Sequence, residues 1–89
     1  MTITKTFTRM EVAEFNGKDG KPCWMIYRSG VYDFTKYLNK HPGGKKVMLE
    51  YAGKDCTKDF ESMGHTKEAV IDMVPYKIGE LQEVKLDFI

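Results

Sequence analysis

The chain has two histidines, and each occupies a place where a sharp backbone turn is expected. His41 opens the tetrapeptide "HPGG" at 41–44, and His65 stands between a glycine and a threonine in "GHT" at 64–66. Neutral imidazole is the commonest metal-binding side chain, and its ligating nitrogen must be held in one orientation. A corner of restricted backbone provides that orientation better than a mobile loop does, so both histidines are candidate metal ligands.

Three interpretations of the two histidines stay open on their spacing alone. They could be ordinary surface or hydrogen-bonded core residues, which is the usual role of an isolated histidine. They could bind zinc together with Cys23 and Cys56, although the spacings do not match the short paired spacings of structural zinc sites. They could also supply the two axial ligands of a haem, which needs one ligand on each face and apolar walls around the ring.

The backbone around His41 is expected to join two short helices. Asp33 can cap the first helix, which must stop near His41 because the residue before a proline disfavours the helical conformation. The second helix is expected to begin at about Lys45 and to end at Gly53, since glycine suits the left-handed conformation that follows many helices.

A second pair of helices is expected to meet at His65. Asp55 can cap a helix that Gly64 closes, and Thr66 can cap the next helix, which Pro75 ends. The apolar residues that flank the two corners are Phe34, Tyr37, Val47, Met48, Phe60, Met63, Ile71 and Met73. These side chains could fill a core by themselves, or they could line a slot for a flat apolar ligand.

The remaining segments predict a small sheet and one further helix. Thr8 and Glu11 form a capping-box pattern that starts a short helix. The stretch "CWMIYRSGVYDF" at 23–34 predicts a β-hairpin that turns around residues 29–30. The stretch "YKIGEL" at 76–81 is the last expected strand.

Length and charge limit the classes of protein to which the chain can belong. Eighty-nine residues form one domain, which we place at 1–89 with its core at 7–81. Fourteen basic and thirteen acidic residues give a net charge of +1 without a basic stripe, which argues against nucleic-acid binding. No apolar run approaches the ~20 residues of a membrane span, and the opening "MTITKTFTRM" is too polar for a signal peptide.

The two cysteines indicate a reducing compartment. Cys23 and Cys56 lie far apart and form no C-x-x-C motif, so the cytosol is the expected setting and a structural disulfide is not expected. The absence of a C-x-x-C-H motif excludes covalent attachment of a c-type haem. The ending "VKLDFI" lacks a linker-like tail, from which we expect a complete soluble protein of the cytoplasm.

Longer stretches around both histidines resemble one known family. They are "FTRMEVAEFN" at 7–16, "VYDFTKYLNKHPGG" at 31–44, "AGKDCTKDFESMGHT" at 52–66 and "IGEL" at 78–81. Together with Trp24 in the hairpin, they resemble the cytochrome b5 haem-binding family over nearly the whole chain. The resemblance implies an α+β, cytochrome b5-like fold, in which a small mixed β-sheet supports two short helical pairs that clasp a haem b. Trp24 would lie in a second core beneath the sheet.

The resemblance also implies which residues hold the cofactor. His41 and His65 would be the axial ligands of the haem iron, and Thr66 would contact a haem propionate. The residues that match the walls of the family's pocket are Phe34, Tyr37, Val47, Met48, Phe60 and Met63. Further expected wall residues are Tyr27, Ile71 and Met73.

The function implied by this ligand set is electron transfer. Two protein ligands would leave the iron no vacant position, which disfavours oxygen activation and indicates a carrier, not an enzyme. By resemblance, a soluble, monomeric carrier would receive electrons from a flavin-dependent cytochrome b5 reductase. It would pass them to desaturases, hydroxylases or haem-thiolate monooxygenases, which it could meet at the cytosolic face of membranes.

The sequence departs from the family pattern at three places. Lys45 and Lys46 stand where many members carry acidic residues, so a nearly neutral pocket rim should steer partners only weakly. The loop "NGKDGKP" at 16–22 is slightly longer than in compact relatives, and we expect no functional effect from it. Asp72 occupies a place that is often apolar, so either it faces solvent or its helix is locally shifted.

Three alternatives assign the chain differently. A regulator of the same superfamily that binds haem or a steroid-type ligand would lack the paired histidines, which counts against this alternative. The chain could instead be a haem domain excised from a membrane-anchored or fusion redox enzyme. A haem-free interaction module would show no visible absorbance when it is expressed with enough haem.

Overall fold

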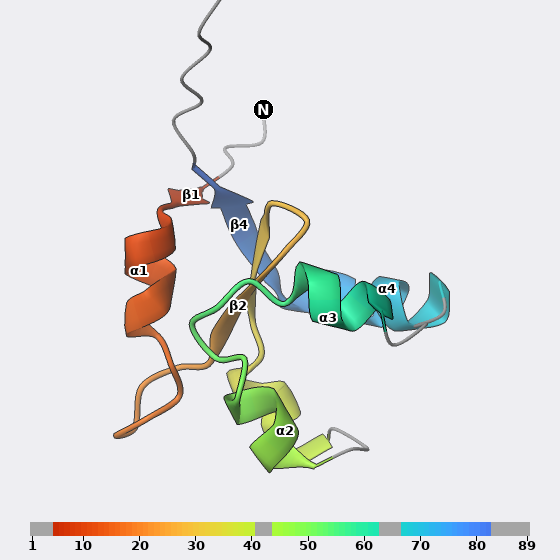
Figure 1. The fold of residues 1–89 in the computed structure, drawn as a ribbon, viewed down its shortest axis with the longest axis horizontal. Coiled ribbons are helices and arrows are strands. Elements are labelled where there is room, and N and C mark those ends of the chain that lie inside the picture. Colours follow the sequence, from red (N-terminus) through yellow and green to blue (C-terminus); the bar gives the residue numbers. More distant parts are fainter. Residues whose placement is uncertain (1–4, 41–43, 63–66, 83–89) are drawn as a thin grey trace, which may run out of the picture.

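The computed structural model describes residues 5–40, 44–62 and 67–82, which form a four-stranded mixed sheet with short helices on both faces (Figure 1). The strands are β1 (Thr6–Phe7), β2 (Trp24–Tyr27), β3 (Gly30–Asp33) and β4 (Lys77–Leu81). Their order across the sheet is β1-β4-β3-β2, with β1 parallel to β4 and the other two pairs antiparallel. The hairpin and the last strand confirm the sequence-based expectation, whereas β1 was not expected.

The hairpin turns one residue earlier than the sequence suggested. Arg28 and Ser29 occupy the two central positions, and both have positive φ angles, 46° and 66°. Two consecutive positive φ angles match the twist of the flanking strands in a two-residue hairpin loop. Gly30 is the first residue of β3 and pairs with Tyr27. A Cβ atom at Gly30 would lie 2.8 Å from the ring of Tyr32, so the glycine is needed for packing.

Helix α1 (Arg9–Glu14) covers a small core on one face of the sheet. Its capping box is present as expected, with the Glu11 amide donating to the Thr8 hydroxyl and the Thr8 amide donating to the Glu11 carboxylate. Val12, Ile26 and Val31 are fully or almost fully buried there. The residues packed around them are Phe7, Trp24, Ile78 and Leu81. Trp24 thus lies in a second core, as predicted, and its ring stacks on Phe15 at 4.0 Å between centroids.

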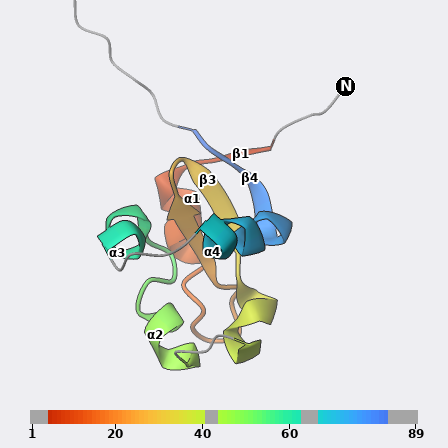
Figure 2. The same cartoon turned by 90° about the vertical axis from the view of Figure 1, so that its right-hand side faces the viewer.

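Short helices form the other layer, which Figure 2 shows from the side of α4. They are η1 (Thr35–Lys40), α2 (Lys45–Leu49), α3 (Thr57–Ser62), α4 (Lys67–Met73) and η2 (Val74–Tyr76). The Asp33 carboxylate accepts from the Thr35 amide, so the predicted cap is present, although η1 is a 3-10 helix. The prediction that the second helix extends to Gly53 was wrong, because α2 ends at Leu49. Turns lead from there to Gly53, whose φ is +79°.

The larger core lies between the sheet and this layer of short helices. Strand β2 divides its side chains by alternation, with Met25 and Tyr27 facing the larger core and Trp24 and Ile26 facing the smaller one. The other buried members of the larger core are Cys23, Tyr32, Phe34, Leu38, Met48, Ala52, Cys56 and Met73. Among the described residues, no helix is long and apolar enough to span a bilayer.

Candidate functional site

The two candidate ligands belong to short segments between helices. His41 lies in the segment between η1, which ends at Lys40, and α2, which begins at Lys45. His65 lies in the segment between α3 and α4. Four predicted site residues fall outside the described ranges, namely His41, Met63, His65 and Thr66. The structure therefore shows where the other predicted wall residues lie and which elements lead into the two corners.

Six of the predicted wall residues come together in the larger core. Tyr27, Phe34, Met48 and Met73 are buried members of one cluster, and Tyr37 and Phe60 pack against that cluster. They come from six different parts of the chain, which are β2, the segment after β3, η1, α2, α3 and the end of α4. Residues far apart in the sequence thus form one apolar cluster among the elements that border both histidine segments.

Aromatic rings form much of this cluster. The Tyr27 ring meets the Phe60 ring edge-on at 5.0 Å between centroids, which connects β2 to α3. Phe34 lies 6.1 Å from Tyr37, and both rings contact Tyr76 of η2, at 5.6 and 5.3 Å. Edge-to-face and tilted pairs at these distances are favourable beyond the area that they bury. Phe34, Tyr37 and Tyr76 together connect the start of η1 to the end of η2.

Three aromatic members of the cluster, Tyr32, Tyr51 and Tyr76, were missed by the sequence analysis. Tyr32 stacks on Phe34 at 5.7 Å, and burial raises the pKa of its hydroxyl, so the phenol remains protonated. Its position in β3, two residues before Phe34, was the available signal, because alternate strand residues share a face. Tyr76 follows Pro75, and nothing in its local sequence indicates that η2 turns the ring toward Phe34.

Several apolar residues beside the two histidine segments are exposed. Val47 on α2 is 41% exposed, and Ile71 on α4 is 64% exposed. Val70 within α4 and Val74 directly after it are also exposed. A flat apolar ligand held between the two histidine segments would cover side chains of this kind. The chemistry of the walls therefore fits a haem, which needs apolar contact on both of its faces.

Asp72 and its neighbours show how α4 is oriented. Asp72 is exposed and Met73 is buried, so the aspartate faces solvent and the helix keeps its register. Residues two apart on an α-helix point about 200° away from each other. Ile71 and Met73 therefore cannot both line one wall. Met73 belongs to the buried cluster, whereas Ile71 lies on the surface of the helix.

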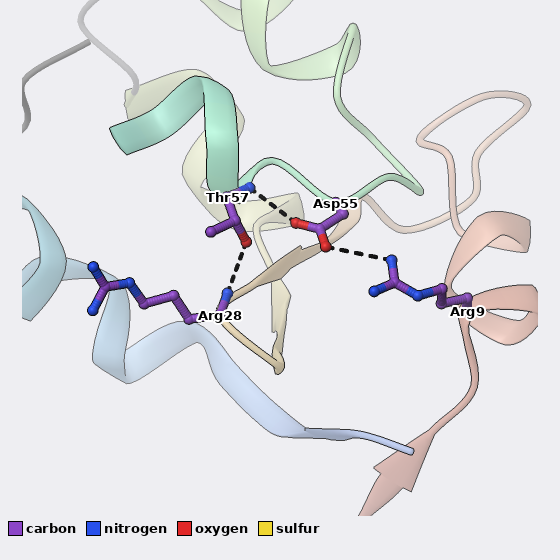
Figure 3. Close-up of polar contacts among 4 residues, drawn as sticks. All are labelled: Arg9, Arg28, Asp55 and Thr57. Carbon is purple, nitrogen blue, oxygen red and sulfur yellow. Dashed lines mark hydrogen bonds and ion pairs between the residues drawn. The ribbon is translucent and has the colours of Figure 1, made fainter. Parts of the chain in front are cut away.

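A chain of polar contacts fixes α3 to the hairpin and to α1 (Figure 3). The Arg28 amide donates to the Thr57 hydroxyl at 2.9 Å, and the Thr57 amide donates to the Asp55 carboxylate at 2.9 Å. The Arg9 guanidinium donates to the same carboxylate at 3.3 Å. The Arg28 guanidinium also pairs with Glu61 on α3. Because Phe60 lies beside Glu61, these contacts position one wall of the pocket.

The electrostatics of Asp55 follow from this arrangement. Burial alone would raise the pKa of the Asp55 carboxyl group, but hydrogen bonds from Thr57 and Arg9, with the charge of Arg9, outweigh burial. The pKa is therefore lower than its ordinary value of 3.8. Asp55 stays charged at neutral pH and accepts from both partners.

The two cysteines lie in the larger core as free thiols, as expected for a chain without a structural disulfide. Burial raises the pKa of Cys23 and of Cys56 to about 11. Metal ions bind the thiolate form, which such a pKa disfavours at neutral pH. In the ranges 5–40, 44–62 and 67–82, no three carboxylate, thiol or imidazole side chains are grouped to hold a metal ion.

Comparison with known proteins places the chain among described relatives. The sequence model of the cytochrome b5-like heme/steroid binding domain matches residues 8–82. Cytochrome b5 of Drosophila melanogaster is 51% identical over 80 residues, which are 90% of this chain and 58% of that protein. Cytochrome b5 of Nicotiana tabacum is 41% identical over 83 residues, covering 93% and 60%. The chain thus spans less than two thirds of the length of these relatives.

Solved structures give the same result at the level of the backbone. Cytochrome b558 of Ectothiorhodospira vacuolata, described as a prokaryotic homologue of cytochrome b5, has a TM-score of 0.77 at 35% identity. The match covers 89% of this chain and all of that one. Cytochrome b5 of Ostreococcus tauri virus 2 has a TM-score of 0.74 at 35% identity and covers 85% and 95%. The arrangement of sheet and helices is therefore shared with both.

Proposed function

The chain belongs to the family of cytochrome b5-like haem/steroid-binding domains, and on this premise we propose that it is a one-electron carrier with a non-covalently bound haem b. The family and the α+β fold confirm what the sequence resemblance predicted. The observation that supports haem binding best is the aromatic cluster beside both histidine segments, with exposed apolar residues on α2 and α4. This surface has the apolar character that a porphyrin requires.

The residues proposed to hold the haem fall into three groups. His41 and His65 would be the two axial ligands, and Thr66 would donate to a propionate. The proposed walls are Tyr27, Phe34, Tyr37, Val47, Met48, Phe60, Met63 and Met73. Ile71 would contact the cofactor only from the surface of α4, because it does not share a face with Met73. When bound, haem iron supplies a one-electron Fe(III)/Fe(II) couple.

The protein would contribute ligation, exclusion of small molecules and a rigid surrounding. Two imidazoles would occupy both axial positions, so oxygen or a substrate would have no position to enter without displacing a histidine. Packed aromatic rings and the contacts that fix α3 would limit rearrangement when the charge of the site changes. These properties support a carrier and not an oxygen-activating enzyme.

The paired histidines favour haem over a steroid-type ligand, which is the second ligand class in the name of the family. A steroid requires no metal ligand, so one histidine in each corner would have no role in binding it.

The proposed electron donor is a flavin-dependent cytochrome b5 reductase. The proposed acceptors are desaturases, hydroxylases and haem-thiolate monooxygenases. We also propose that residues 1–89 act as a single haem-binding domain.

Absorption spectra of the oxidised and reduced protein, expressed with ample haem, test the proposal. We expect the spectra of a low-spin haem b with two histidine ligands, and no change when carbon monoxide is added to the reduced form. His41→Ala and His65→Ala should each abolish this six-coordinate spectrum.

Matched controls are Asn39→Ala and Glu68→Ala, which change exposed residues two and three positions from the histidines. Both controls should keep the parent spectrum. A colourless protein, or a six-coordinate spectrum that survives in either histidine variant, would contradict the assignment.

A further inference from the structure

A groove of about 610 Å³ is lined by α2, the turns after it, and the end of α1 with its adjoining loop. Figure 1 shows α1 and α4 on opposite sides of α2. Ala13 and Asn16 line it from α1 and the residues that follow, and Lys18 lines it from the adjoining loop. Helix α2 and the turns after it provide the opposite side, with Lys46, Leu49, Glu50, Ala52, Gly53 and Lys54. None of these residues belongs to the proposed haem site.

The charged residues of this groove are mostly basic. Lys18, Lys46 and Lys54 are exposed at its edge, with Glu50 as the single acidic lining residue. Within the part of the chain that the structure describes, none of these lysines forms an ion pair, whereas Arg9, Arg28 and Lys77 each pair with a carboxylate. The groove therefore carries a local excess of positive charge on a chain whose net charge is only +1.

The floor of the groove is apolar and closely packed. Ala52 is buried and Leu49 is half-buried. A Cβ atom on Gly17 would lie 2.7 Å from Leu49 Cδ2, and one on Gly53 would lie 3.0 Å from the Ala13 carbonyl oxygen. The absence of a side chain at these two glycines thus allows the segments that line the groove to pack closely against each other. Their φ angles, +74° and +79°, are ones that other residues rarely adopt, so the backbone at both positions requires glycine.

The backbone amides around the groove are already engaged. The Gly17 amide donates to the Pro22 carbonyl, and the Gly53 amide donates to the Trp24 carbonyl. The Lys18 amide donates to the side chain of Asn16, and the Lys54 amide donates to the Tyr51 carbonyl. Phosphate sites are typically built from free backbone amides that converge on the anion. This groove offers separated ammonium groups around an apolar floor instead.

We propose that the groove is a docking site for an acidic segment of a partner protein, one that alternates carboxylates with apolar side chains. Carboxylates would meet Lys18, Lys46 and Lys54, and an apolar side chain would rest on Leu49 and Ala52. The proposal gives a role to the loop at 16–22, from which the sequence analysis expected none. It does not depend on haem binding, so either proposal can fail alone.

Titration of the ¹⁵N-labelled, haem-loaded protein with a synthetic peptide of alternating glutamate and leucine tests this site by NMR. We expect the largest amide shifts at Lys18, Leu49 and Gly53. The affinity should weaken when salt rises from about 0.01 M to about 0.15 M, because the Debye length falls from about 30 Å to about 8 Å. The triple change K18E/K46E/K54E should raise the dissociation constant about tenfold or more.

The matched control is K5E/K58E/K67E, which makes the same change in net charge at exposed lysines outside the groove. It should alter the dissociation constant less than twofold. An equal loss in both triple variants, or shifts that map elsewhere on the unmodified protein, would overturn the site. Inorganic pyrophosphate that shifts the same amides and displaces the peptide at equal concentration would overturn the assignment to an acidic protein segment.

Discussion

The two faces of the sheet are completed in different ways. Beneath α1, Val12, Ile26 and Val31 are closed off by neighbouring side chains, and at most 2% of each residue is exposed. On the other face, the larger core continues to the surface, where Val47 and Ile71 remain 41% and 64% exposed. The first face is complete with protein atoms alone. The second has the composition of a core that a ligand completes.

The largest loss of stability is expected in the core beneath α1, where Ile26→Ala removes the largest fully buried side chain. We expect it to lower the free energy of unfolding by about 3 kcal/mol, because the lost transfer energy adds to the energy of the cavity left behind. Urea unfolding of the haem-loaded and haem-free proteins measures the loss, which should be the same in both forms.

Met10→Ala is the control for this substitution. It changes a residue on the same side of the sheet that is 82% exposed, so the free energy of unfolding should change by less than about 0.5 kcal/mol. If the loss of unfolding free energy in Ile26→Ala differed between the haem-loaded and haem-free proteins, the core beneath α1 would be coupled to the haem pocket. The distinction between the two faces of the sheet would then be wrong.

The second effect is a gain in stability on the face that carries the larger core, when haem is added to the haem-free protein. At a free haem concentration of about 100 times the dissociation constant, the protein should gain about 2.7 kcal/mol in stability. Hydrogen exchange should slow most in α2 and α4, whereas β2 and β3 should be well protected in both forms. Equal slowing throughout, or the same gain with a steroid in place of haem, would contradict this distinction between the two faces.

The smallest effect concerns Asp55, whose contacts reach α1 on one side and α3 on the other. The folded-state pKa of Asp55 is lowered, so the charged carboxylate contributes stability above its ordinary value of 3.8. That contribution is lost as the pH falls through the lower folded-state pKa. It should be below about 1 kcal/mol, because the side chains of Arg9 and Asp55 are 53% and 35% exposed.

Asp55→Asn tests this contribution, because asparagine can still accept from the Thr57 amide without carrying the charge. Unfolding of both proteins across acidic and neutral pH should show a difference at neutral pH that disappears in strong acid. Glu14→Gln, a change at an exposed residue of α1, should show no such trend. A difference that grows as the pH falls would reverse the sign and refute the interpretation.

Local signals in the sequence predicted most of the elements. The capping box at Thr8, the cap at Asp33 and the hairpin each depend on residues a few positions apart, and all three are present. Strand β1 was missed because two residues carry no pattern, and its existence depends on β4 at the other end of the chain. The early end of α2 was missed because the chain continues to turn after Leu49. The amides of residues 50–52 donate to carbonyls three positions earlier, and only the Gly53 amide reaches a distant carbonyl, that of Trp24.

The candidate site was likewise predicted only in part. The positions of Phe34, Met48 and Phe60 in one cluster agree with the family resemblance. The orientation of α4 was not predicted, because the sequence analysis assigned both Ile71 and Met73 to the pocket. Met73 is buried in the cluster, whereas Ile71 is exposed. Tyr76 joined the cluster only through the 3-10 turn that follows α4.

The parallel pairing of β1 with β4 brings residues 5 and 82 to the same end of the molecule. The Glu80 amide donates to the Lys5 carbonyl, and the Gln82 amide donates to the Phe7 carbonyl. Figures 1 and 2 place this end opposite α2. A tether attached at either terminus, in a longer polypeptide or on an electrode, would therefore hold the domain by the end that carries β1 and β4. The opposite end, which carries α2, would remain free to contact a partner.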